Sequence, residues 1–205
     1  YLSQQGLLNN TIIIFTSDDG DMMGDHHLWR KCYPYECSAH IPLLVCLPPA
    51  MRKNIHSSSE ARVCLQDIMP TILDACGVEI PEGVDGKSVL PLIRDEETAW
   101  RDFVHGEHKQ CYAPENEHHF LTDGTWKYIW FTQTNTEQLF HLENDPYETT
   151  DLAAHAQYQE ELAQWRGRLI EDLEPRNAGL VENGQLICQA GKPTPVSPHY
   201  RAKEE

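Results

Sequence analysis

Residues 12–31 have the sequence IIIFTSDDGDMMGDHHLWRK, which passes directly from an apolar run into a charged loop. The run at 12–15 is short and rich in β-branched residues, so it predicts a strand covered on both faces of a parallel sheet. Open α/β sheets place their chemistry just beyond the carboxyl ends of such strands. We therefore expect the functional residues of this chain in the loop that follows.

The loop begins with two adjacent carboxylates, Asp18 and Asp19, which are followed by Gly20. Hard cations such as Ca²⁺ bind clustered carboxylate oxygens, so Asp18 and Asp19 are candidate metal ligands. Asp-Gly pairs are also common in turns that bind nothing, and the pair alone does not separate the two interpretations. The residues that follow favour the metal site.

Two further side chains of the loop, His26 and Lys31, suit an anionic substrate held beside a cation. Lys31 comes after the apolar pair Leu28-Trp29, which predicts a side chain held in place, although most lysines are solvated. His26, when protonated, can bind an anionic oxygen or act as a general acid. The alternative for His26 is a loop histidine bonded to the backbone.

Further motifs follow this loop in order along the chain. The series is FTSDDG at 15–20, GDH at 24–26 with Lys31, AHIPLLV at 39–45, DIMPTIL at 67–73, GVDGKS at 83–88 and EQLFHLENDPYE at 137–148. In this order the motifs resemble the type I sulfatases, which are formylglycine-dependent sulfuric-ester hydrolases of the alkaline phosphatase superfamily. The resemblance covers most of residues 7–172.

The resemblance implies an α/β fold, here the C-terminal portion of an alkaline-phosphatase-like sulfatase fold. It implies a Ca²⁺ ion, with Mg²⁺ as the alternative, held by Asp18 and Asp19. Lys31 would bind the sulfate oxygens, and His26 would contact the sulfate or assist the leaving oxygen, while a formylglycine hydrate attacks sulfur. The implied substrate is a sulfated carbohydrate or another sulfated small molecule.

The chain departs from the family pattern in several respects. Asp19 stands where the family usually has Asn or His, which adds a second full negative charge. The Cys/Ser-x-Pro-x-Arg motif that yields formylglycine is absent, since neither Cys32 nor Cys37 has the required neighbours. The family's N-terminal Asp-Asp metal ligands are absent too. We therefore expect this chain to be the C-terminal part of a sulfatase and to be inactive by itself.

The sequence pattern divides the chain into a C-terminal part of the catalytic α/β domain (1–95), a subdomain of antiparallel sheet and helix (96–175) and an extended tail (176–205). In the second part, aromatic and β-prone segments alternate with turn residues, and Asp123-Gly124 predicts a hairpin. The helix that follows carries one apolar stripe, formed by Tyr158, Leu162, Trp165 and Leu169.

A polar, histidine-rich group surrounds the predicted antiparallel sheet. It consists of His105, Glu107, His108, His118 and His119. No His-x-x-x-His or Cys-x-x-Cys spacing supports zinc binding in this group. In the glycan-directed sulfatases that the chain resembles, this subdomain often lines the substrate cleft, and on that ground His105 is a candidate substrate-binding residue.

The charge of the chain limits its partners. Its 16 basic and 32 acidic residues give a net charge of −16, which argues against nucleic acid and against an anionic membrane. No apolar run reaches membrane-spanning length, and no signal-peptide pattern is present, so the compartment stays open between periplasmic or secreted and cytoplasmic.

Seven cysteines predict mostly buried thiols, with one disulfide as the alternative.

Two other functions fit the same residues. A phosphonate monoester or phosphodiester hydrolase of the same superfamily shares the Gly-Asp-His and lysine pattern. A non-catalytic interaction module is the alternative from another class; the absent nucleophile favours it and the retained Asp18, Asp19 and Lys31 oppose it. An apolar sheet edge around residues 12–15 would favour self-association of the chain.

Overall fold

The computed structural model describes residues 1–52 and 58–192, which form two compact units. The first unit consists of Tyr1–Asp18 and Ile41–Val104, and the second of Asp19–His40 with the described residues from His105 onward. The chain therefore leaves the first unit between Asp18 and Asp19, inside the motif that the sequence singled out. The domain boundaries near residues 95 and 175 stay a prediction.

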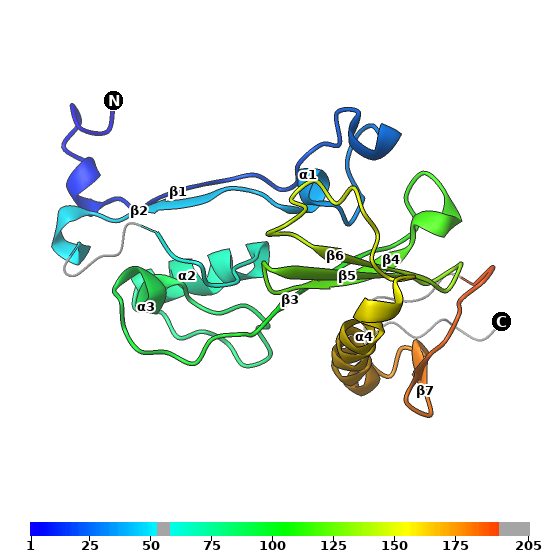
Figure 1. The fold of residues 1–205 in the computed structure, drawn as a ribbon. Coiled ribbons are helices and arrows are strands. Elements are labelled where there is room, and N and C mark those ends of the chain that lie inside the picture. Colours follow the sequence, from blue (N-terminus) through cyan, green and yellow to red (C-terminus); the bar gives the residue numbers. More distant parts are fainter. Residues whose placement is uncertain (53–57, 193–205) are drawn as a thin grey trace. The chain divides into compact units, whose positions relative to one another are not determined.

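The described residues of the first unit form two strands, two helices and three short 3-10 turns (Figure 1). They are β1 (Ile13–Thr16), β2 (Leu43–Cys46), α2 (Ile68–Ala75), α3 (Leu90–Ile93) and the turns at Leu8–Asn10, Pro49–Met51 and Leu65–Asp67. Strand β3 (Val104–His108) begins at the last residue of this unit.

Strand β1 corrects the expectation of a parallel sheet covered on both faces. Its partner is β2, and the two run antiparallel with Ile14 opposite Val45 and Phe15 opposite Leu44. Ile14 and Val45 line the same small gap as Ile68 of α2, so one face of this ribbon packs on the helix. A short β-branched run indicates a strand but does not state the direction of its partner, because that direction is set by residues distant in sequence.

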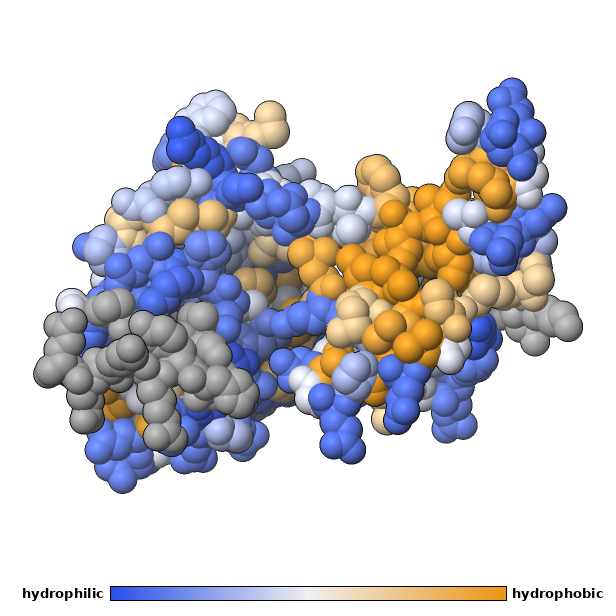
Figure 2. Space-filling model, turned by 180° about the vertical axis from the view of Figure 1, so that it is seen from behind, coloured by the Kyte–Doolittle hydropathy of each residue, from blue (hydrophilic) through white to orange (hydrophobic). Residues whose placement is uncertain are grey.

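The other face of the β1–β2 ribbon is exposed. Phe15 keeps 63% of its surface accessible and Leu44 keeps 58%, and these two side chains are direct cross-strand neighbours. Figure 2 shows the hydrophobic area that such side chains form on the first unit. The predicted apolar surface around residues 12–15 is therefore present in this chain.

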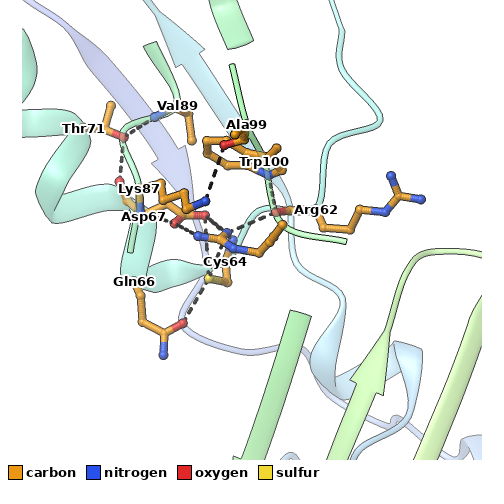
Figure 3. A network of polar contacts seen from close by, with 10 residues as sticks. Arg62, Cys64, Gln66, Asp67, Thr71, Lys87, Val89, Ala99 and Trp100 are labelled. Carbon is orange, nitrogen blue, oxygen red and sulfur yellow. Dashed lines mark hydrogen bonds and ion pairs between the residues drawn. The ribbon is translucent and has the colours of Figure 1, made fainter. Parts of the chain in front are cut away.

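A buried carboxylate holds the first unit together (Figure 3). Asp67 is fully buried, and its two oxygens each lie 2.6 Å from the guanidinium of Arg101. The same oxygens accept hydrogen bonds from the backbone N–H groups of Cys64 (2.9 Å) and Lys87 (2.8 Å). Asp67 thus joins the motif at 67–73 to the motif at 83–88.

Gly86 explains why the second of these motifs needs a glycine. A Cβ atom at this position would lie 1.9 Å from the backbone oxygen of Gln66, so no larger residue fits without a backbone shift. This close approach lets the adjacent Lys87 N–H reach Asp67. The two motifs are therefore matched by contact as well as by sequence order.

The second unit is built on a four-stranded sheet in the order β3-β4-β5-β6, in which β4, β5 and β6 run antiparallel, as the sequence predicted for this sheet. Its further strands are β4 (His118–Thr122), β5 (Trp126–Phe131) and β6 (Thr136–His141), and its helices are α1 (Glu36–Ala39) and α4 (Gln159–Leu173). A small hairpin, β7 (Val181–Glu182) and β8 (Gln185–Leu186), follows the turn at Glu174–Arg176. Further 3-10 turns lie at Asp25–His27, Pro114–Asn116 and Ala156–Tyr158.

The predicted hairpin is confirmed, and so is the helix stripe from Leu162 onward, whereas Tyr158 lies in the turn before α4 and is only partly buried. Asp123 accepts hydrogen bonds from the N–H groups of Thr125 and Trp126, and Gly124 has a φ of 85°, which a side chain would strain. On α4, Leu162, Trp165 and Leu169 are buried, together with Leu173 one turn further on. The helix therefore covers the sheet with a continuous apolar face.

The tail predicted at 176–205 is described as far as residue 192. Its described part returns to the sheet, since the N–H of Gln189 donates to the Thr132 oxygen at 2.8 Å and the N–H of Gly191 donates to the Gln133 side chain at 2.9 Å. The part from residue 193 lies outside the described residues. Among the described residues, no helix is both long and apolar enough to span a bilayer.

A buried ion-pair network ties the 19–40 segment to the sheet. Lys127 of β5 is fully buried, and its ammonium lies 2.5 Å from a carboxylate oxygen of Glu36 and 2.9 Å from one of Glu148. The N–H of Glu36 also donates to Glu148 at 2.6 Å. Burial raises the pKa of Glu36, but a hydrogen bond from His40 and the charge of Lys127 outweigh it and bring that pKa down to about 2.

We expect Lys127→Met to lower the free energy of unfolding of the second unit by about 3–5 kcal/mol, because it leaves the buried Glu148 and the partly buried Glu36 without their cation. The measurement is the urea midpoint of the chain, followed by the fluorescence of the buried Trp130 and Trp165. The matched control is Lys192→Met, at an exposed lysine. Equal midpoints for the two variants would contradict the prediction.

We expect Asp67→Asn to lower the free energy of unfolding of the first unit by about 3–5 kcal/mol. The reason is that Arg101 would lose its charged partner in a largely buried site. Burial raises the pKa of Asp67, but the Arg101 hydrogen bonds and the two N–H donors hold it below its usual value. The stabilisation is therefore complete above about pH 4 and is lost as the pH falls.

Urea midpoints measured from neutral to acidic pH test the role of Asp67. The difference in urea midpoint between the parent chain and Asp67→Asn should become smaller below about pH 4. Asp85→Asn, at an exposed carboxylate of the same unit, is the control and should leave the midpoint unchanged. A gap that does not depend on pH would rule out the charge of Asp67 as its cause.

Candidate active-site loop

The segment at 19–40 folds onto the antiparallel sheet and not onto the strand that precedes it in sequence. Met22 and Tyr35, from the two ends of this loop, are buried in one cluster with Ile129 and Phe140 of the sheet. Tyr35 also donates a hydrogen bond to Gln138 at 3.0 Å. These contacts give the loop a fixed conformation, which a binding site requires.

Gly20 brings the two ends of the loop together. Its N–H donates to the Ser38 oxygen at 2.9 Å, and a Cβ at this position would lie 2.1 Å from the Cys37 oxygen. Any other residue would therefore push the chain away from α1. This contact fixes the backbone next to Asp19.

Asp19 and Lys31 are brought together by this fold. The Lys31 ammonium lies 3.0 Å from an oxygen of Asp19, and both side chains are partly exposed, at 49% and 33%. Asp18 is exposed and is the last residue of its stretch of the first unit. The loop thus presents a carboxylate and an ammonium side by side at a surface that a solute can reach.

The imidazole of His26 is held by the motif at 137–148. Its Nε2–H donates to the backbone oxygen of Tyr147 at 3.1 Å, and its ring stacks on Tyr35 with centroids 4.1 Å apart. The structure therefore contains the backbone bond that the sequence gave as the alternative for His26. That bond occupies Nε2 and leaves Nδ1 as the nitrogen that can meet another group.

His105 lies where the sheet meets α4, and its side chain is only 8% exposed. Its Nδ1 is 2.6 Å from a carboxylate oxygen of Asp172, and its Nε2 is 3.0 Å from Nδ1 of His119. Arg176 completes the group through Asp172 at 2.9 Å. Both ring nitrogens thus have partners within the fold, and a substrate-binding role for His105 stays a prediction.

Burial favours the neutral form of His118 and His119, the two histidines of β4. Burial lowers the pKa of His118 to about 4 and also lowers the pKa of His119, because a charged imidazole is poorly solvated inside the sheet. The hydrogen bond from His105 lowers the pKa of Asp172, with the Arg176 charge adding to it. His105, Glu107 and His119 therefore form a polar network that is anchored on Asp172 of α4.

The structure brings two sets of side chains close enough to hold a metal among the described residues. One is His105, Glu107 and His119, and the other is Cys32, His108 and Cys111; in each set the ligand atoms lie within 4.8 Å of one another. Sequence analysis missed the second set, although His108 and Cys111 have the x₂ spacing that metal sites use. Cys32 is too far away in sequence to have indicated it.

The expectation of mostly buried thiols is wrong. None of the seven cysteines, all of which are among the described residues, is buried or forms a disulfide. Three are exposed, and the other four, which include Cys32 and Cys111, are partly buried. Cys46 illustrates the reason, because it lies on the uncovered face of the β1–β2 ribbon, opposite Ile13.

The chain matches the protein-family model described as N-sulphoglucosamine sulphohydrolase, C-terminal, over residues 24–174. It is 40% identical over 201 residues to an arylsulfatase of Clostridium perfringens, a match that covers 98% of this chain and 41% of that protein. The chain thus spans less than half the length of this curated relative.

Two solved structures share its fold. A protein in complex with its substrate D-glucosamine-2-N,6-O-disulfate superposes with a TM-score of 0.74 at 26% identity, covering 85% of this chain and 36% of that one. The phosphonate monoester hydrolase of Agrobacterium radiobacter superposes with a TM-score of 0.71 at 27% identity, covering 83% and 36%. The resemblance that the motifs indicated and the α/β fold class are confirmed: the chain belongs to the sulfatases of the alkaline phosphatase superfamily.

Proposed function

We propose that the whole protein to which this chain belongs is a sulfuric-ester hydrolase. The observation that carries the proposal is the Asp19–Lys31 pair, 3.0 Å apart in a loop that is fixed on the sheet. An ammonium beside a carboxylate of metal-ligand type suits a sulfate group, whose oxygens need a cation close by. The 40% identity to an arylsulfatase supports the same chemistry.

Asp18 and Asp19 are the proposed ligands of a hard cation, Ca²⁺ or Mg²⁺. Their donor set fits such an ion only in part, since Ca²⁺ takes about six to eight oxygens. Asp19 is held beside Lys31, and Asp18 is exposed, so both carboxylates are accessible. When bound, the ion polarises the sulfate oxygens and neutralises part of their charge.

Lys31 and His26 are the proposed groups that act on the substrate. Lys31 binds a sulfate oxygen and stabilises the charge that develops on the transferring group. His26 is oriented by Tyr35 and by the Tyr147 oxygen, and in its protonated form it can contact a sulfate oxygen or give the leaving oxygen a proton from Nδ1. The formylglycine nucleophile would come from a residue outside this chain, and we propose that the chain alone is inactive.

A sulfated carbohydrate is the proposed substrate, ahead of a small aryl sulfate. The structural neighbour crystallised with a disulfated glucosamine supports this class. The second candidate is a phosphonate monoester or phosphodiester, which the similarity to the Agrobacterium enzyme supports. The exposed apolar face of β1–β2 supports self-association when the chain is produced alone.

We expect Asp18→Ala or Lys31→Ala, made in the whole protein, to lower kcat for a sulfate ester by about 100-fold or more, the cost of losing one preorganised electrostatic group. Asp21→Ala is the matched control, because Asp21 is exposed and bonds within the loop to the Met23 N–H. Steady-state kinetics with circular dichroism on each variant is the measurement. Near-normal turnover by folded Asp18→Ala or Lys31→Ala would refute these roles.

We expect the whole protein to hydrolyse an aryl sulfate faster than an aryl phosphate diester or an aryl phosphonate monoester. The 205-residue chain by itself should hydrolyse none of the three. The rates are compared as kcat/KM under one set of conditions. A preference for the phosphorus esters would select the second candidate function. Turnover by the 205-residue chain would show that its nucleophile lies among residues 1–205.

A further inference from the structure

The cluster of Cys32, His108 and Cys111 lies wholly within the second unit. Cys32 follows Lys31 in the loop, His108 is the last residue of β3, and Cys111 lies in the β3–β4 connection. Their ligand atoms lie within 4.8 Å of one another, and all three residues are partly buried. Two segments that are 76 residues apart along the chain (108 − 32) therefore converge on one point with two sulfur atoms and one nitrogen.

The imidazole of His108 makes a hydrogen bond of the kind that metal-binding histidines make with their second nitrogen. Its Nδ1 lies 2.5 Å from the backbone oxygen of Lys109, so Nδ1 carries the proton and donates it to that oxygen. Nε2 is then the nitrogen with a free electron pair. Metal-binding histidines almost always have such an outer hydrogen bond, which fixes both the tautomer and the plane of the ring.

The two segments that carry the thiols are also fixed next to each other. The ring of Tyr33 lies 6.1 Å from that of Tyr112, and the guanidinium of Arg30 lies 5.9 Å above the Tyr112 ring. The Cys111 oxygen accepts hydrogen bonds from the Asn116 side chain (2.9 Å) and from the Ala113 N–H (2.7 Å). The residues on both sides of the cluster thus hold it in place.

We propose that Cys32, His108 and Cys111 bind one thiophilic divalent cation, for which Zn²⁺ is the representative, with water as the fourth ligand. Zinc–sulfur distances of about 2.3 Å and zinc–nitrogen distances of about 2.0 Å put tetrahedral ligands roughly 3.5–4 Å apart, so the cluster needs little closure. Binding deprotonates both thiols and releases two protons to solvent. Two thiolates, one neutral imidazole and one divalent ion make the site electrically neutral.

The second metal-like cluster is a poorer site. Glu107 of that set lies 2.5 Å from Arg176, which also lies 2.9 Å from Asp172. His105 and His119 bond to each other at 3.0 Å. A guanidinium already neutralises the carboxylates there, so an added cation would be repelled and would have to break these bonds.

The proposed zinc site differs from the proposed calcium site in its chemistry and in its effect. Sulfur and imidazole ligands select soft or borderline ions, whereas the carboxylates of Asp18 and Asp19 select hard ones. A metal at Cys32 would fasten the loop next to Lys31 onto the β3–β4 connection. A disulfide between Cys32 and Cys111 is the competing outcome, but a disulfide gives no role to the oriented His108.

Co²⁺ is a suitable probe, because thiolate ligands give it an intense charge-transfer absorption that Zn²⁺ does not show. The full 205-residue chain, reduced with a phosphine, is titrated with Co²⁺ and then with Zn²⁺. We expect one equivalent of Co²⁺ to produce the thiolate band and one equivalent of Zn²⁺ to remove it. Cys111→Ser and His108→Gln should weaken Co²⁺ binding by more than about 100-fold, beyond the loss that outer-shell changes cause.

Cys76→Ser and His155→Gln are the matched controls, at an exposed thiol and an exposed imidazole outside the cluster, and should bind as the parent chain does. Alkylation of the parent chain read by mass spectrometry needs no variant: Zn²⁺ should protect Cys32 and Cys111 while Cys76 and Cys188 react. Absence of the thiolate band, equal alkylation of all four thiols with and without Zn²⁺, or a reduced chain that only re-forms a Cys32–Cys111 disulfide would each overturn the proposal.

Discussion

The buried ammonium of Lys127 is the interaction on which the second unit depends. It lies on a central strand of the sheet with no solvent contact, and its charge is acceptable there only because Glu36 and Glu148 face it at 2.5 and 2.9 Å. Glu36 belongs to the loop at 19–40, and Glu148 ends the motif at 137–148. One charge on the sheet therefore positions two segments that are distant in sequence, and both segments contribute to the proposed active site.

The loop that Lys127 anchors combines a rigid backbone with accessible side chains. Met22 and Tyr35 are buried against the sheet, while Asp19 and Lys31 remain partly exposed. His26 is held between Tyr35 and the Tyr147 oxygen, so its orientation comes from the same two segments. Electrostatic catalysis needs this combination, because charged groups that are already in place lose little energy to reorganisation when the substrate reacts.

The proposed thiol–imidazole site attaches the same loop at a second point, Cys32, which precedes Glu36 in the sequence. Cys32 is separated from Glu36 by three residues, so the stretch that ends the loop would be held by a metal at one point and by an ion pair at the other. The two attachments respond to different conditions. The ion pair weakens when carboxylates are protonated, and the metal site is lost when the thiols are oxidised or the ion is chelated.

The amino-acid sequence was enough to predict the family, the order of the motifs, the antiparallel sheet with its Asp123-Gly124 hairpin and the apolar stripe of α4. These features depend on residue type and on short spacings, which a single sequence displays. The folded chain was needed to show that β1 pairs antiparallel with β2, that Asp67 joins two motifs through the Lys87 N–H, and that Cys32 meets His108 and Cys111. Each of these is a contact between residues far apart along the chain, and such contacts are set by packing and charge pairing in three dimensions, which local residue patterns do not encode.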